Sequence, residues 1–266
     1  MTRKSSLYIH VYRNIRKSGF QPKNFSICKN ETFADRVISF NEKLKLEERL
    51  PGNIRAMNPF AGNPAALTTS SAFYRKYYND NRKRHLLLGI NPGRFGAGVT
   101  GIPFTDTKRL EEKCGLGITG LKTHEPSSVF VYEVIDAYGG VCKFFRDFYI
   151  NSPSPLGFVK KTEDGRELNF NYYDSRELQD ALEGFMARCI KEHIALGIYT
   201  DTALCLGSGK NFRYLSSLNE KHRFFKKIVP LEHPRYIMQY RSRDKEYFIS
   251  KYLSALAGLR DNIIRS

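Results

Sequence analysis

The sequence contains no CxxC pair, and its five cysteines (Cys28, Cys114, Cys142, Cys189 and Cys205) lie far apart. This spacing excludes a zinc ribbon and an iron–sulfur cluster, and it does not suggest a disulfide framework. We therefore expect reduced thiols in a cytoplasmic protein that uses no metal and no other cofactor.

Long apolar runs are also missing. No stretch approaches the 18 or so apolar residues that cross a bilayer. The basic N-terminus MTRKSSLYIHVYRNIRK lacks the apolar segment of a signal peptide. These absences exclude a membrane protein and give no sign of secretion.

Acidic residues are few relative to basic ones. The chain has 43 Lys and Arg against 27 Asp and Glu, which gives a net charge of +16. Such a surplus favours a polyanionic partner, and nucleic acid before membrane, because no segment has the pattern of a lipid-binding amphipathic helix. The plain alternative is a basic surface that only keeps the protein soluble.

The pattern of elements predicts an α/β fold. Residues 85–90, 144–150, 202–206 and 224–232 are expected strands, and they alternate with expected helices that include 31–48, 174–198 and 243–256. We expect one three-layer αβα domain over residues 1–266, with a mostly parallel four-stranded sheet and the first 30 or so residues as an extension. Asp174 and Glu177 suggest a capping box for the second of these helices, on which His193 is expected to be structural.

Conspicuous polar residues follow three of the expected strands. Asn91 comes after the first in the loop GINPGRFGAGVTGIPF, Asn151 after the second, and His233 after the last. Because parallel strands bring their carboxyl ends to one edge, these side chains can converge there. Phe104 ends the same loop and is expected to add a flat apolar wall. For the loop alone, an ordinary strand-to-helix turn remains the alternative.

Two nucleotide-binding motifs are approached but not matched. GSGKN at residues 207–211 has Leu204 and Asn211 where a P-loop needs Gly and Ser or Thr, and GINPGRFG lacks the G-x-G-x-x-G spacing. An enzyme with a nucleotide cofactor is therefore disfavoured. Two interpretations of GSGK remain. Lys210, at the N-terminus of an expected helix, can contact a DNA phosphate, or the segment is a plain turn between a strand and a helix.

The loop GINPGRFGAGVTGIPF resembles the first motif of the single-strand-selective monofunctional uracil-DNA glycosylases, GMNPGPFGMxxTGVPF. DFYINSPSPLGF is similar to their central segment, and LEHPRYIMQYR stands in the place of their second motif, which begins His-Pro-Ser-Pro-Arg-Asn. The resemblance runs in order over residues 33 to 260. Its departures indicate a divergent subgroup, which we expect to be bacterial.

The resemblance implies roles that suit the residue types. Asn151 would read the 4-oxo and N3–H edge of uracil, Phe104 would stack on the base, and Ile90 and Gly93 would line the pocket. His233 would stabilise the departing base, and Asn91 would orient the attacking water. With no lysine at these strand ends, we expect hydrolysis that leaves an abasic site.

Other residues have two interpretations each. Asp106 is a rival base or a helix N-cap. The DNA-intercalating wedge is Arg235 or Ile237, depending on the alignment. Arg94 and Ala97 replace a proline and a methionine, which can change the bases accepted. The exposed loop 159–173 carries Lys160, Lys161 and Arg166 as DNA contacts or as a solvated charge run.

The sequence thus predicts a monomeric DNA N-glycosylase of base excision repair that removes uracil, and related oxidised or deaminated bases, from DNA with the base flipped out. The preference for single or double strands stays open. Alternatives are a glycosylase acting mainly on xanthine or hypoxanthine, and a nucleic-acid-binding module without catalysis. We expect it in the cytoplasm, with the nucleoid if bacterial.

Overall fold

The protein is described by a computed structural model that covers residues 31–118 and 120–264, with side chains placed up to residue 260. The residues from Glu31 onward cluster as one compact unit. Cys28, the basic N-terminus and the expected extension lie outside the described residues.

The central sheet contains four parallel strands: β2 (His85–Leu88), β3 (Phe148–Asn151), β6 (Thr202–Leu206) and β7 (Lys227–Leu231). Their order is β3-β2-β6-β7. The chain passes from β2 to β3 on one side and then crosses to β6 on the other. A crevice for ligands is expected at such a switch point, beyond the carboxyl ends of the strands.

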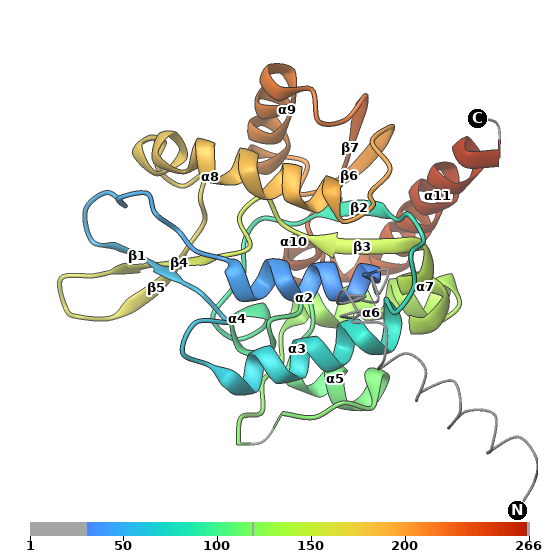
Figure 1. Ribbon diagram of the computed structural model, residues 1–266, viewed down its shortest axis with the longest axis horizontal. Coiled ribbons are helices and arrows are strands. Elements are labelled where there is room, and N and C mark those ends of the chain that lie inside the picture. Colours follow the sequence, from blue (N-terminus) through green and yellow to red (C-terminus); the bar gives the residue numbers. More distant parts are fainter. Residues whose placement is uncertain (1–30, 119, 265–266) are drawn as a thin grey trace, which may run out of the picture. The chain divides into compact units, whose positions relative to one another are not determined.

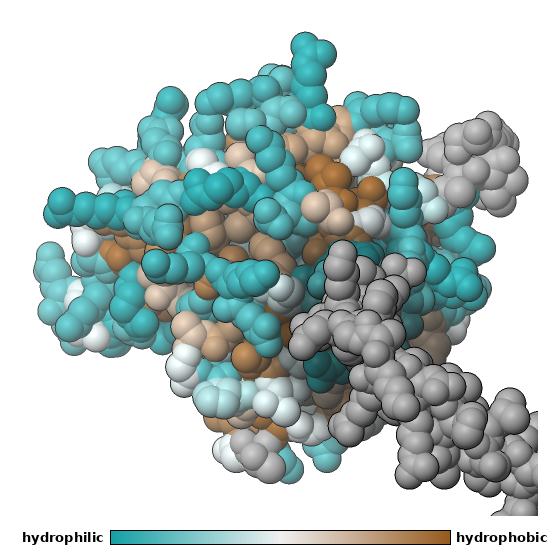
Figure 2. Space-filling view, in the orientation of Figure 1, coloured by the Kyte–Doolittle hydropathy of each residue, from teal (hydrophilic) through white to brown (hydrophobic). Residues whose placement is uncertain are grey.

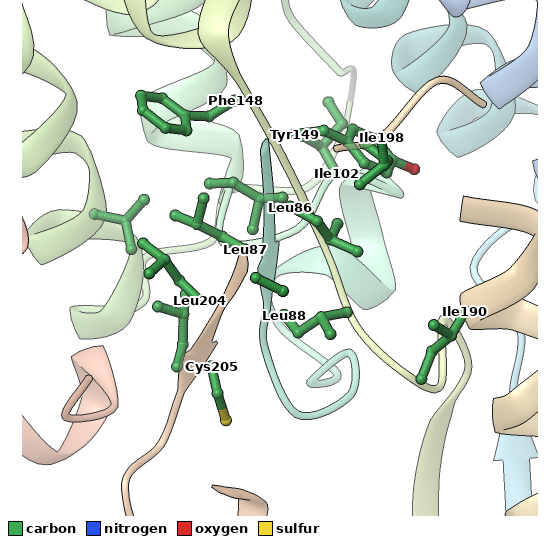
Figure 3. Close-up of a cluster of buried hydrophobic side chains, with 14 of the residues drawn as sticks. Leu86, Leu87, Leu88, Ile102, Phe148, Tyr149, Ile190, Ile198, Leu204 and Cys205 are labelled. Carbon is green, nitrogen blue, oxygen red and sulfur yellow. The ribbon is translucent and has the colours of Figure 1, made fainter. Parts of the chain in front are cut away.

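Continuous apolar runs explain why these strands form the centre. Every residue of β2 and β6 is buried, as expected for parallel strands covered on both faces. In Figure 3, Leu86, Leu87 and Leu88 lie among the core side chains, and Phe148 and Tyr149 point to opposite sides of the sheet. Because side chains alternate along β3, Tyr149 and Asn151 lie on the same face of the strand.

Helices cover both faces of the sheet (Figure 1). Tyr149 packs on Phe33 of α2, and Phe148 packs on Phe144 of α7. The expected three-layer α/β fold is confirmed. The helices are α2 (Phe33–Lys43), α3 (Pro64–Tyr77), α4 (Ala97–Thr100), α5 (Thr107–Cys114), α6 (Pro126–Tyr138), α7 (Val141–Asp147), α8 (Arg176–Ala195), α9 (Lys210–His222), α10 (Pro234–Tyr240) and α11 (Lys245–Ile264).

The expected helices at 31–48, 174–198 and 243–256 correspond to α2, α8 and α11, with different ends. The capping box predicted for α8 is wrong: Ser175 is its N-cap and accepts from the Leu178 N–H. The Asp174 carboxylate instead accepts from the Asn171 N–H. A serine hydroxyl next to the helix is the better-placed cap, and Asp174 closes the preceding turn.

Two predictions about local structure are wrong. The strand expected at 144–150 begins only at Phe148, because Val141–Asp147 forms α7. The expected loop 159–173 is largely a hairpin of β4 (Gly157–Lys161) and β5 (Glu167–Phe170), and β4 also pairs with β1 (Ile54–Met57). These three strands form a separate antiparallel sheet, which projects on the left of Figure 1. Its strands alternate too weakly between apolar and polar residues to be recognised from the sequence.

The surface in Figure 2 is mostly hydrophilic, with small apolar areas between long polar side chains. Within residues 31–118 and 120–264, no helix is long and apolar enough to span a bilayer. Cys114, Cys189 and Cys205 are buried free thiols, and Cys142 is an exposed one.

Candidate active site

A cleft of about 1440 Å³ opens beyond the carboxyl ends of the central strands. It contains all of the predicted catalytic and base-binding residues and two of the predicted DNA contacts. These are Ile90, Asn91, Gly93, Phe104, Asn151, His233, Lys210 and Arg235. The convergence expected from the sequence is present in the structure.

His233 is held at the start of α10, as its N-cap. Its Nδ1 accepts a hydrogen bond of 3.1 Å from the Arg235 N–H. A main-chain N–H can only donate, so Nδ1 is unprotonated and the neutral ring carries its hydrogen on Nε2. Burial, aided by the Arg235 charge, lowers the pKa of His233 to about 4. The residue is therefore a neutral donor at pH 7.

Asn91 is held by the segment that follows β5. Its Oδ1 accepts from the Tyr172 N–H at 3.2 Å, and its Nδ2 donates to the Phe170 carbonyl at 3.3 Å. An amide oxygen accepts two hydrogen bonds and an amide nitrogen donates two. Its Nδ2 also donates to the Pro92 carbonyl at 3.5 Å, so both donor positions are used. One acceptor position of Oδ1 therefore remains for a ligand or water in the cleft.

Asn151 ends β3 and is buried. Its Oδ1 accepts from the Ser152 N–H at 2.8 Å, and its Nδ2 donates to the Tyr149 hydroxyl at 2.5 Å. Unlike Asn91, this side-chain amide keeps one donor and one acceptor position. Such a pair matches the edge of a base that presents one acceptor beside one donor.

Phe104 has a left-handed backbone conformation, with φ at +52°. This conformation costs a residue with a side chain about 1–2 kcal/mol. The ring lies 5.7 Å from the His233 ring, and a Cβ on Gly89 would come within 2.9 Å of it. Glycine at position 89 therefore lets the ring lie against the end of β2. Strained backbone that aims a side chain into a cleft is typical of a functional site.

The first-motif loop is tightly folded on itself. The Gly98 N–H donates to the Gly93 carbonyl at 2.9 Å, and a Cβ on Gly98 would lie only 2.6 Å from that oxygen. The Arg94 N–H donates to the Asn169 side chain on β5. The loop that connects β2 to α4 is therefore held by contacts with itself and with β5, and it lines one side of the cleft.

The GSGKN segment divides its polar residues between the cleft and the core. Lys210 begins α9 and is exposed at the cleft. Asn211 is buried, and its Nδ2 donates to the carbonyls of Gly89 and Leu206. Asn211 thereby ties together the ends of β2 and β6. Position 211, where a P-loop has Ser or Thr, thus holds a side chain that makes structural contacts in the core.

The two candidates for the wedge differ completely in exposure. Ile237 is fully buried in the core, so that alternative is wrong. Arg235 is exposed and lines the cleft. Tyr236 and Tyr240 also line it, with their rings 5.6 Å apart and with 44% and 66% of their surfaces exposed. The sequence interpretation missed these tyrosines.

Lys160, Lys161 and Arg166 are exposed on the β4–β5 hairpin and do not line the cleft. Arg166 forms an ion pair with Asp164, and the Lys160 ammonium lies 5.6 Å from the centre of the Phe170 ring. The hairpin nevertheless reaches the cleft through Asn169. These cations therefore lie outside the lining of the cleft.

Asp106 is not available as a base. It is fully buried, caps α5 through the Arg109 N–H, pairs with the Arg109 guanidinium and accepts from the Glu125 N–H. Glu125 itself lines the cleft, with its carboxylate against Gly96. Burial and the Asp106 charge raise the pKa of Glu125. The sequence interpretation missed this carboxylate.

His193 is the structural histidine that was expected. It is fully buried on α8, and its Nε2 lies 3.3 Å from the Ser152 carbonyl. Burial lowers the pKa of His193 to about 4, so the ring is neutral and Nε2 donates. Among the described residues, no group of three or more His, Cys, Asp and Glu side chains is placed to hold a metal ion.

Comparison with known proteins agrees with this geometry. Residues 75–257 match the model of the uracil DNA glycosylase superfamily. The fold is similar to the crystal structure of wild-type SMUG2 from Pedobacter heparinus, with a TM-score of 0.85 and 52% identity. The similarity covers 86% of this chain and 99% of that one. No curated protein matches.

The family match includes the cleft loops at Asn91, Asn151 and His233, and the resemblance predicted from the three motifs is confirmed. The chain therefore belongs to the uracil DNA glycosylase superfamily and is a DNA glycosylase.

Proposed function

We propose that the enzyme hydrolyses the N-glycosidic bond of uracil, and of related oxidised or deaminated bases, flipped out of DNA into the described cleft. The observation that carries this proposal is the convergence of two amides, a neutral imidazole and a strained aromatic residue at one sheet edge. We further propose that it acts as a monomer on genomic DNA in the cytoplasm. The family match and the similarity to SMUG2 do not favour a non-catalytic binding module.

His233 supplies the electrostatic part of the chemistry. When the bond between the sugar C1′ and the base N1 breaks, both electrons move to the base, and negative charge develops on its 2-oxo group. The His233 Nε2–H donates to that oxygen. A donor fixed in advance stabilises the transition state without reorganisation, and losing one such donor typically costs about 10²–10³ in rate.

Asn91 supplies orientation. Its amide cannot act as a general base at neutral pH, but its free Oδ1 position can accept from a water molecule facing C1′. The water oxygen then bonds to C1′ and loses a proton to solvent, and the base anion takes up a proton. The products are an abasic site and the free base.

Phe104 and Asn151 bind the extrahelical base. Stacking on an aromatic ring contributes about 1–3 kcal/mol per base, which offsets part of the cost of unstacking. The free donor and acceptor positions of Asn151 match the 4-oxo group and N3–H of uracil. Cytosine presents the opposite pattern at the same edge, so normal DNA is spared.

The DNA strand itself is held at the rim of the cleft. Lys210 and Arg235 bring positive charge to phosphates, and Tyr236 and Tyr240 offer faces on which neighbouring bases can stack. Lys160, Lys161 and Arg166 extend the positive surface along the hairpin. Of the two candidates for the intercalating wedge, Arg235 is the one that lines the cleft, so we assign the wedge to it.

One assay tests the proposal directly. Purified protein is incubated with oligonucleotides that each carry a single uracil, hydroxymethyluracil, xanthine or hypoxanthine, and alkali then reveals abasic sites. We expect cleavage at uracil in the presence of EDTA. Cleavage only at xanthine or hypoxanthine would show that deaminated purines, and not uracil, are the main substrates. Cleavage that depends on an added divalent metal would contradict the proposed mechanism.

Two variants test the assigned roles. We expect His233→Ala and Asn91→Ala to lower the single-turnover rate by about 10²–10³ at saturating enzyme, with little change in affinity for undamaged DNA. His222→Ala is the matched control, because His222 lies on α9 and does not line the cleft. A wild-type rate in either active-site variant would refute the role of that residue.

A further inference from the structure

Tyr149 is a buried residue that the mechanism above does not use. It precedes Asn151 by two positions in β3, and residues at this spacing point to the same face of a strand. Its hydroxyl consequently meets the Asn151 side chain, whose Nδ2 donates to it at 2.5 Å. The second fixed partner of this amide is the Ser152 N–H, which donates to Oδ1 at 2.8 Å.

These two contacts determine which way the Asn151 amide faces. The Ser152 N–H can only donate, so the side-chain atom facing it must be the oxygen. A flipped amide would set two donors against each other and leave both buried and unsatisfied. Such a mismatch typically changes a preference by about tenfold to a hundredfold. The orientation that remains presents an N–H and an oxygen lone pair to the cleft, in the arrangement that uracil requires.

Ser152 is itself anchored. Its carbonyl accepts from His193 Nε2 at 3.3 Å, and its hydroxyl donates to the Ser154 carbonyl at 2.7 Å. His193 is rooted in α8, well away from the strand in sequence. The donor that fixes the amide oxygen is therefore not free to move with the base.

The Tyr149 hydroxyl is equally immobile. Its ring is fully buried and lies 5.3 Å from Phe33, 5.9 Å from Tyr78 and 5.8 Å from His193. Aromatic rings at such separations pack as rigid groups. The packing of these rings thus holds the Tyr149 hydroxyl oxygen within hydrogen-bond distance of the Asn151 side-chain amide.

We propose that Tyr149 is a positioning residue for base recognition: together with the Ser152 N–H, it holds the Asn151 amide in the orientation that accepts uracil and rejects cytosine. The proposal rests on the base-reading role proposed for Asn151. Tyr149 does not touch the substrate, and its effect is transmitted entirely through the Asn151 side chain.

The test compares two isosteric variants. Tyr149→Phe removes the hydroxyl that faces Asn151. Tyr78→Phe removes a buried hydroxyl of the same cluster that donates to the Phe148 carbonyl, also on β3. We expect Tyr149→Phe to lower single-turnover excision of uracil by about 3- to 10-fold at saturating enzyme. Tyr78→Phe should stay within twofold of wild type, and the affinity of both variants for undamaged DNA should be unchanged.

A spectroscopic readout separates positioning from general loosening of the core. The side-chain amide protons of Asn151, observed by NMR, should exchange with water faster in Tyr149→Phe than in Tyr78→Phe or wild type. Equal excision rates for the two variants, or unchanged exchange in Tyr149→Phe, would overturn the proposal.

Asn151→Asp distinguishes this failure from failure of the underlying function. A carboxylate at this position would repel the 4-oxo group of uracil, so this variant should lose uracil excision. The same carboxylate can accept a hydrogen bond from the 4-amino group of cytosine, so the variant should gain weak cytosine excision. If Asn151→Asp cleaves uracil normally, Asn151 does not read the base and both proposals fall. If it loses uracil excision while Tyr149→Phe behaves like Tyr78→Phe, only the role of Tyr149 is refuted.

Discussion

The main chain of Arg235 fixes the tautomer of His233: its N–H donates to Nδ1 at 3.1 Å and leaves the ring hydrogen on Nε2. The pKa of His233 is lowered to about 4, so the ring takes up a proton only well below pH 6.5. We expect the single-turnover rate to show no inflection near pH 6.5 and to change only as the pH approaches 4. NMR titration of the His233 ring nitrogens would check this. An apparent pKa near 6.5 would mean that the ring is solvated and its tautomer unfixed.

Phe104 allows backbone strain and ring stacking to be separated. Phe104→Ala and Phe104→Gly both remove the ring, and the loss of stacking should lower uracil excision by about tenfold or more. Glycine tolerates positive φ and alanine does not, so Phe104→Gly should be more stable than Phe104→Ala by about 1 kcal/mol. Urea unfolding measures this difference. Greater stability of the alanine variant would show that residue 104 does not hold a left-handed conformation.

The exposed tyrosines of α10 should contribute to DNA affinity by stacking. Tyr240→Ala is expected to weaken binding to single-stranded oligonucleotides by about 1–3 kcal/mol, measured by fluorescence anisotropy. Tyr247→Ala is the matched control, because Tyr247 is 64% exposed and does not line the cleft. Equal losses in the two variants would place the bound strand elsewhere.

Lys210 is expected to contact a phosphate. For duplex DNA, each such contact contributes roughly −0.9 to the slope of log K against log salt. Lys210→Ala should therefore make the slope shallower by about one unit. Lys226→Ala should leave it unchanged, because Lys226 pairs with Asp201 before β7, away from the carboxyl ends of the strands. An unchanged slope for Lys210→Ala would favour the plain-turn interpretation of GSGK.

Glu125 should oppose both stability and DNA binding at neutral pH. Because its pKa is raised in the folded state, the protonated form is favoured there and ionisation destabilises the protein as pH rises through that pKa. Glu125→Gln should raise Tm at pH 7.5 by about 2–4 °C, equivalent to about 1 kcal/mol. The gain should vanish below pH 4.5, and DNA affinity should increase. A hundredfold loss of excision in this variant would instead identify Glu125 as the group that activates water.

The sequence predicted the central sheet because β2 and β6 are continuous apolar runs, which are typical of buried parallel strands. The parallel order then implied that Asn91, Asn151 and His233 share one edge. Helical periodicity could also have decided between Arg235 and Ile237. Positions 236 and 240 share one face of α10, which is the exposed face, while Ile237 points into the core.

The parts that could not be predicted depend on contacts between distant segments. The β4–β5 hairpin also pairs, through β4, with β1, which lies about a hundred residues earlier in the chain. The main-chain N–H of Glu125, whose side chain lines the cleft, donates to Asp106, which lies 19 residues earlier in the chain. The contact between Tyr149 and Asn151 also has no signal in the sequence, because a tyrosine in an apolar strand is typical of an ordinary core position.

Asn91, Asn151 and His233 share one further property: an acceptor atom of each is paired with a main-chain N–H, from Tyr172, Ser152 and Arg235 respectively. Every amino acid except proline supplies this N–H. Ser152 and Tyr172 are buried, but Arg235 is exposed at the cleft. Substitutions at position 235 other than proline would therefore keep the N–H that sets the tautomer of His233 while changing the side chain that faces DNA. The enzyme can vary this contact during evolution without changing the hydrogen that His233 offers to the base.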